Sequence, residues 1–81
     1  MHITVKLFAS TADLIGSRQI ALDLAEGSTV GDLREAVGEQ YPKMRPFLPM
    51  IVCAVNESYE SPQTVLHEGD DVALIPPVSG G

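Results

Sequence analysis

The sequence has little cysteine and little positive charge. Cys53 is its one cysteine, which excludes an internal disulfide framework and is typical of a reducing compartment. The chain carries 5 basic and 11 acidic residues, a formal net charge of −6 that disfavours binding to nucleic acid and to anionic membranes. No apolar run approaches the roughly 20 residues of a membrane helix, and the first residues lack the pattern of a secretory signal. We therefore expect a cytoplasmic protein with no membrane segment and no nucleic-acid partner.

The sequence also lacks a recognisable catalytic or metal-binding constellation. His2, His67 and Cys53 are too far apart to form a metal motif, and Asp70-Asp71 lies in a turn signal where acids are common. No phosphate-binding loop is present, and no carboxylate has a histidine or serine partner at a telling position. Cys53 lies in an apolar run with no basic neighbour in sequence that would activate its thiol. We predict no metal site, no bound cofactor and no autonomous enzyme.

The apolar pattern predicts two strands near the start of the chain. A chain of 81 residues can build only one compact core. Alternation over His2–Phe8 and again over Arg18–Leu24 is the period of half-buried strands. The small residues of Ala9–Ser17, which include Gly16, predict a connection between them. These two strands should form a hairpin.

A helix is predicted to follow. Thr29 and Asp32 have the spacing of a capping box, in which side chains satisfy the first free N–H groups of a helix. Val30, Leu33 and Val37, with Tyr41 as a further candidate, then follow helical spacing. The helix should stop at Pro42, because proline cannot continue it.

The second half predicts a crossing and two more strands. Three prolines within Pro42–Pro49 argue against a regular helix or a central strand and predict a stiff surface connection. Ile51–Val55 is a continuous β-favouring run, as in a strand covered on both faces, and a turn at Asn56-Glu57 follows. After the turn signal Glu68–Asp71, the last strand, Val72–Ile75, ends at Pro76. This order predicts an α+β fold with a helix packed across one mixed sheet.

The last residues have the composition of a thin, extended tail. We expect one domain over residues 1–76 and a flexible tail over residues 77–81. Pro76 and Pro77 favour a stiff exit from the sheet, Val78 and Ser79 are small, and Gly80 and Gly81 have no side chain. Five residues reach on the order of 17 Å. Such a tail can deliver the carboxylate of Gly81 into another protein's active site, where adenylation by an ATP-using partner would activate it.

Three apolar residues form a candidate docking patch. Phe8 and Ile75 fall on the side of their strands opposite the expected core residues, where they could meet Tyr59. Exposed apolar patches often mark partner sites. The alternative is ordinary packing of these side chains under the proline-rich crossing. Lys43 and Arg45 form a small positive spot that we interpret as solvated surface charge.

Several segments together resemble one known family. They are Phe8-Ala9, Ala54-Val55-Asn56, Glu68-Gly69-Asp70-Asp71-Val72-Ala73 and Pro76-Pro77-Val78-Ser79-Gly80-Gly81. Over its whole length the chain resembles the small-subunit family of molybdopterin synthase, often called MoaD. The resemblance implies a ubiquitin-like β-grasp fold. Family members often carry an Arg-Glu pair where this chain has Ala12-Asp13, so one polar contact to a partner is in question.

The family's chemistry implies a carrier that acts with three other proteins. An E1-like adenylyltransferase (MoeB type) adenylates Gly81, and a sulfur donor such as a cysteine desulfurase converts the adenylate to a thiocarboxylate. The tail, with Gly80 and Gly81 as its catalytic end, enters the large synthase subunit (MoaE type) in a heterotetramer, where sulfur passes to a pterin precursor and forms the molybdenum-binding dithiolene. By the same resemblance, the positions of Phe8, Tyr59 and Ile75 match hydrophobic partner contacts.

Three other functions share these sequence features. A protein modifier would use the same activated Gly81 to form isopeptide bonds with lysines of target proteins. A sulfur carrier for thiazole synthesis would use the same activation, although Pro76-Pro77-Val78 before the glycines is more typical of the molybdopterin branch. A plain β-grasp interaction module would need no reactive terminus at all.

Overall fold

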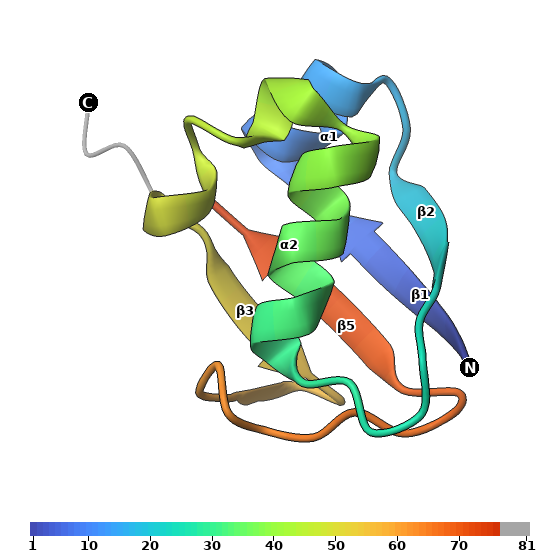
Figure 1. Ribbon diagram of the computed structural model, residues 1–81. Helices are drawn as coiled ribbons and strands as arrows, with labels where there is room; N and C mark the ends of the chain where they lie inside the picture. Colours follow the sequence, from blue (N-terminus) through green and yellow to red (C-terminus); the bar gives the residue numbers. More distant parts are fainter. Residues whose placement is uncertain (77–81) are drawn as a thin grey trace.

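The computed structural model describes residues 1–76, and the predicted tail, residues 77–81, lies outside the described residues. Figure 1 shows one sheet with helix α2 lying across one of its faces. The strands lie in the order β2-β1-β5-β3-β4, and β5 is parallel to β1 and antiparallel to β3. The predicted α+β fold, one mixed sheet with a helix packed across it, is confirmed. The elements are β1 His2–Leu7, α1 Ala9–Ile15, β2 Gln19–Asp23, α2 Val30–Gln40, the 3-10 turns η1 Pro42–Met44 and η2 Leu48–Met50, β3 Val52–Val55, β4 Ser58–Tyr59 and β5 Asp71–Ile75.

The core lies between the sheet and α2. Alternate residues of the strands point toward the helix and are buried, as Val5 of β1 and Leu74 of β5 illustrate. From the other side, α2 contributes Val30, Leu33 and Val37, each at most 1% exposed. The strand and helix periods predicted these residues to be buried, because each period places them on the one face of the element that is turned away from water.

The start of α2 follows the predicted capping box. The Thr29 hydroxyl accepts a hydrogen bond from the Asp32 N–H at 3.2 Å, and the Asp32 carboxylate accepts one from the Thr29 N–H at 2.9 Å. The N–H groups of Val30 and Gly31 donate to carbonyls of the loop that precedes β5. The helix ends where Tyr41 caps it, directly before Pro42.

The segment after β1 is helical, which the sequence pattern did not predict. Ala9–Ile15 forms α1, and Gly16 ends it with φ of 82° in the left-handed region that glycine tolerates. Thr11 starts it, because its hydroxyl donates to the Phe8 carbonyl at 2.6 Å and accepts from the Phe8 N–H at 3.0 Å. Seven residues with mixed propensity are too few to show a helical period. The β1–β2 hairpin itself is antiparallel, as predicted.

The proline-rich crossing and the strand after it also depart from prediction. The crossing contains η1 and η2, and its Met44 is 0% exposed, so it belongs to the core and is not only a surface connection. Both turns have a proline in their first two positions, where its fixed φ suits a 3-10 turn and its missing N–H is not needed. In β3, Val52 is 46% exposed, so that strand is not covered along both faces. The short strand β4 was not predicted, and it adds the outermost strand to the sheet.

The turn between β3 and β4 holds two non-glycine residues in left-handed conformations. Asn56 has φ of 49° and Glu57 has φ of 72°, the signs that a two-residue type I′ hairpin turn requires. Two side-chain hydrogen bonds offset the backbone strain at Asn56. Its side-chain NH2 donates to the Asp70 carboxylate at 3.0 Å, and its side-chain oxygen accepts from the Asp71 N–H at 3.1 Å. No side-chain hydrogen bond of the described residues involves Glu57.

We therefore expect Glu57→Gly to raise the free energy of unfolding by about 0.5–1 kcal/mol, because glycine adopts this φ without steric cost. Asn56→Gly serves as the matched change in the same turn and should be neutral or destabilising, since it removes both hydrogen bonds. Urea denaturation of the two variants measures the difference. Equal destabilisation by both would show that the conformation of Glu57 carries no strain.

Candidate docking surface at the root of the tail

The structure brings the three predicted patch residues around one open hollow. Phe8, Tyr59 and Ile75 line a depression of about 520 Å³ on the face of the sheet opposite α2. Phe8 is 47% exposed and Tyr59 is 74% exposed, so these side chains do not pack under the proline-rich crossing. We call this depression the sheet hollow. Its role as a partner site stays a prediction.

Strand register explains why these residues meet. Tyr59 of β4 pairs with Ala54 of β3, and Ala54 pairs with Ala73 of β5. Paired residues point to the same face, so the two alanines form a low floor between the larger side chains. Ile75 follows two residues after Ala73 on that face, and Phe8 continues the outward set of β1 just beyond its last residue.

Charged residues lie along one side of the sheet hollow. Lys6 and Asp71 form an ion pair of 3.4 Å there, and Glu57 lines the same opening. Both members of the pair are about half exposed, so it contributes little to stability. A partner that covers the hollow would therefore meet an apolar floor with charges of both signs at its margin.

Pro76 marks the root of the tail and borders a second depression. This depression, about 420 Å³, lies between α1 and the turn η2, and its apolar lining includes Leu14, Phe47, Met50 and Ile51. We call it the helical groove. The other predicted tail residues, Pro77, Val78, Ser79, Gly80 and Gly81, lie outside the described residues.

Phe47 and Met50 are candidate surface residues that the sequence reasoning missed. They are 44% and 55% exposed and stand beside Pro76. The signal that could have found them is the presence of large apolar residues within a segment whose prolines keep it near the surface. Arg34 holds this segment in place, because its guanidinium donates to the Ile51 carbonyl at 2.9 Å and to the Leu48 carbonyl.

Cys53 is a core residue. It is 4% exposed on the helix-facing side of β3, paired with Leu74 of β5. Burial raises the pKa of the Cys53 thiol above its ordinary value, and the nearby charge of Arg34 only partly offsets this. The thiol is therefore protonated and shielded at neutral pH, which fits packing and not sulfur transfer.

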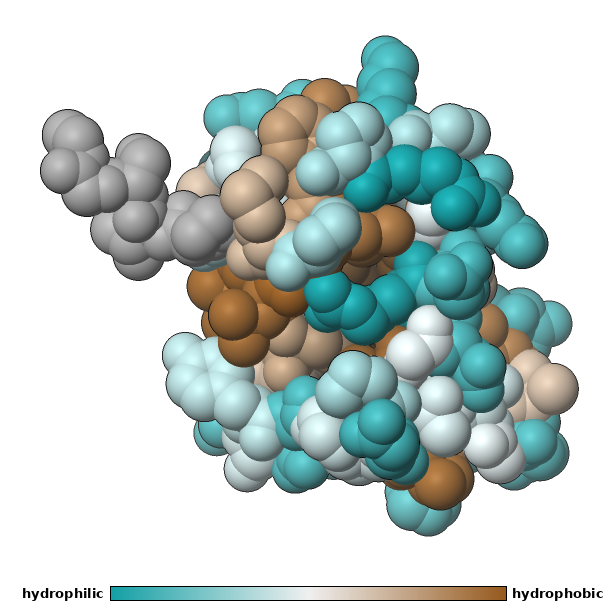
Figure 2. Space-filling view, turned by 60° about the vertical axis from the view of Figure 1, so that its left-hand side comes forward, coloured by the Kyte–Doolittle hydropathy of each residue, from teal (hydrophilic) through white to brown (hydrophobic). Residues whose placement is uncertain are grey.

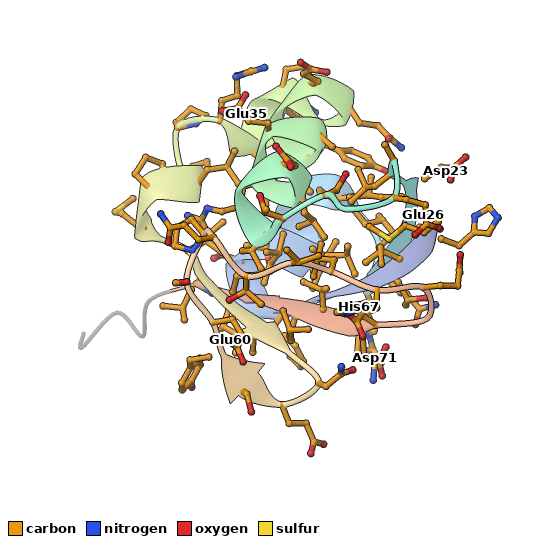
Figure 3. The ribbon with its side chains drawn as sticks, turned by 60° about the horizontal axis from the view of Figure 1, so that its bottom comes forward. Asp23, Glu26, Glu35, Glu60, His67 and Asp71 are labelled. Carbon is orange, nitrogen blue, oxygen red and sulfur yellow. The ribbon has the colours of Figure 1, made fainter. Side chains whose placement is uncertain are left out.

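Acidic side chains are spread over the molecule. Figure 3 shows Asp23 on β2, Glu35 on α2 and Asp71 on β5, with Glu26 and Glu60 in loops, and the five side chains are not gathered at one point. Within residues 1–76, no three His, Cys, Asp or Glu side chains gather as a metal site would require. No helix of the described chain has the length and apolar character needed to cross a bilayer.

Comparisons with known proteins agree with this geometry. Residues 5–81 match the model of the ThiS family. The chain is 34% identical, over the full length of both proteins, to a molybdopterin synthase sulfur carrier subunit of Chlamydomonas reinhardtii. An Arabidopsis thaliana protein of the same name is 31% identical and is covered over 84% of its length, with all of this chain aligned.

A solved structure shows the same fold. The crystal structure of small archaeal modifier protein 1 from Haloferax volcanii superposes with a TM-score of 0.89 at 32% identity, and the match covers 100% of both chains. The family model, the full-length relatives and the shared arrangement of one sheet and its helix lead to one assignment. This chain belongs to the ThiS family.

Proposed function

We propose that this chain is a sulfur carrier that transports sulfur as a thiocarboxylate on Gly81, as the small subunit of a molybdopterin synthase. The observation that carries this proposal is the match to the ThiS family, which runs through the terminal Gly80-Gly81. Central strand β5 ends between the two depressions, directly before Pro76. The full-length relatives named as sulfur carrier subunits support the molybdopterin branch.

The chemistry begins with activation of a poor electrophile. A carboxylate oxygen of Gly81 attacks the α-phosphate of ATP, which releases pyrophosphate and leaves an acyl adenylate. A persulfide sulfur then attacks the carbonyl carbon and displaces AMP, forming an acyl disulfide. A second thiol reduces that disulfide and frees the thiocarboxylate. All groups that bind ATP belong to the partner, and this chain binds no cofactor of its own.

The partners follow from these steps. We propose an E1-like adenylyltransferase (MoeB type) for activation, a cysteine desulfurase or similar persulfide donor for sulfur, and a large synthase subunit (MoaE type) for transfer to the pterin precursor in a heterotetramer. Phe8, Tyr59 and Ile75 would dock in turn against the activating enzyme and the large subunit. Pro76, Pro77, Val78 and Ser79 would occupy the channel that leads to the partner's active site.

Intact-mass analysis tests the sulfur chemistry directly. Incubation with the activating enzyme, ATP and a persulfide donor should replace one oxygen of the chain by sulfur. Cys53→Ala should gain the same mass, because the sulfur is on Gly81 and Cys53 is buried. A mass gain that disappears in Cys53→Ala would instead place the sulfur on the thiol, and no gain in either protein would defeat the proposal.

A protein modifier is the second candidate. The likeness to small archaeal modifier protein 1 favours it, since that protein is 32% identical and has the same fold. In this case the acyl adenylate would react with lysine amines of other proteins, and AMP would leave as an amide bond forms. Peptide mapping that finds Gly81 joined to lysine, in place of a thiocarboxylate, would favour this function.

A further inference from the structure

The helical groove has the features of a second contact for the protein that receives the tail. Figure 2 shows apolar side chains gathered next to the point where the described chain ends. The groove is lined by Phe47 and Met50 of the crossing, by Leu14 of α1 and by Pro76. The sheet hollow lies on the other side of the same strand end, at Ile75. The end of β5 and Pro76 therefore lie between the sheet hollow and the helical groove.

The length of the tail determines what can cover the groove. Residues 77–81 span at most about 17 Å, so a buried site that acts on Gly81 lies within that distance of Pro76. A protein that surrounds such a site must bring its own surface close to Pro76. An ordinary interface buries about 800 Å² of each partner, roughly a sixth of the 4925 Å² accessible surface of this chain. Centred on Pro76, it would extend over both depressions.

The chemistry of the groove indicates what the partner presents. Its lining is apolar apart from Ser10, Thr11 and Asp13. Asp13 is exposed, and within residues 1–76 it forms no ion pair. Met50 has an unbranched, adaptable side chain that suits an irregular contact. A large apolar side chain with a lysine or arginine beside it would satisfy both the groove and Asp13, and a basic surface suits a chain of net charge −6.

We infer that the helical groove is a docking site for the large synthase subunit, which inserts an apolar side chain between Phe47, Met50 and Leu14 and sets a basic residue against Asp13. This inference rests on the proposed function. The groove thus adds a contact made by α1 and η2 to the one made by the sheet hollow. Arg34 supports it as a positioning residue, because it fixes the two carbonyls that flank Met50.

Titration calorimetry with the purified large subunit tests the inference. Met50→Glu and Phe47→Glu should each raise the dissociation constant about fivefold or more, because they put a carboxylate into an apolar contact. Asp13→Lys should weaken binding by charge repulsion. Val65→Glu is the matched control, since Val65 is an exposed apolar residue at 47% that lines neither depression, and it should change binding less than twofold.

The outcomes separate the inference from the function it rests on. If Met50→Glu and Phe47→Glu bind within fivefold of the unmodified chain, or if Val65→Glu weakens binding equally, the groove is not a docking site. If the unmodified chain does not bind the large subunit, the proposed function fails first. Thermal melts of each variant show that a loss of binding is not a loss of fold, and Phe47 and Met50 are exposed enough for the fold to persist.

Discussion

Deletion of Gly81 is expected to abolish thiocarboxylate formation, with a loss of about a hundredfold or more. The shortened chain still ends in a glycine carboxylate, Gly80, so the reacting group is chemically the same. Its reach from Pro76 falls by about 3.4 Å, however. A carboxylate displaced by that distance does not meet the adenylating groups of the partner. Intact-mass analysis after incubation with the activating enzyme, ATP and a persulfide donor measures the loss.

The deletion should leave the folded domain unchanged. The described core lies wholly within residues 1–76, and its side chains pack between the sheet and α2. We therefore expect the same midpoint of thermal unfolding and the same affinity, within a fewfold, for the activating enzyme. Gly81→Ala is the complementary change, because it restores the length and adds one methyl group to the narrowest part of the tail. Full activity of the shortened chain would show that position 81 is not the reactive one.

Two neighbouring residues of β5 should separate stability from binding. Leu74 is 0% exposed and packs in the core, whereas Ile75, on the opposite face, lines the sheet hollow. Leu74→Ala should lower the free energy of unfolding by about 2–5 kcal/mol through lost burial and a cavity. Each kcal/mol lowers the unfolding temperature of a domain this small by about 4–8 °C. Leu74→Ala should therefore melt at least about 8 °C lower.

Ile75→Ala should weaken binding and leave stability almost unchanged. Ile75 is only half-buried, so truncation should cost about 1 kcal/mol or less in stability. It removes apolar surface from the centre of the proposed interface, and binding to the large subunit should weaken about tenfold. Differential scanning calorimetry and binding titrations on the two variants give the comparison. Binding of Ile75→Ala that matches the unmodified chain would remove the sheet hollow from the docking surface.

Strands β1, β2 and β5 and helix α2 could be predicted because each has one buried face. Val5 and Leu74 alternate with exposed neighbours, and Leu33 repeats with helical spacing, so the period alone identifies the element. The capping pair Thr29 and Asp32 added a local signal for the helix start. Where buried residues recur with the period of a strand or helix, the sequence is sufficient to identify that element.

The other parts of the fold and of the candidate site depend on contacts that no short stretch of sequence reveals. Helix α1 starts with bonds between Thr11 and the backbone of Phe8, and its seven residues carry no complete apolar stripe. Met44 is buried because η1 packs against α2 and α1, which a proline count does not reveal. The helical groove joins α1, η2 and Pro76 from three distant parts of the chain. Its existence follows from topology, so only the three-dimensional structure could show it.

The position of β5 in the middle of the sheet affects how the protein responds to a pulling force. The strand is hydrogen-bonded on one side to β1 and on the other to β3, and Pro76 directly follows its last residue. A force applied at Pro76 along the strand axis therefore loads both ladders in shear, so that their hydrogen bonds resist together and do not open one by one. The sheet should therefore stay folded under a force large enough to separate the chain from a bound partner.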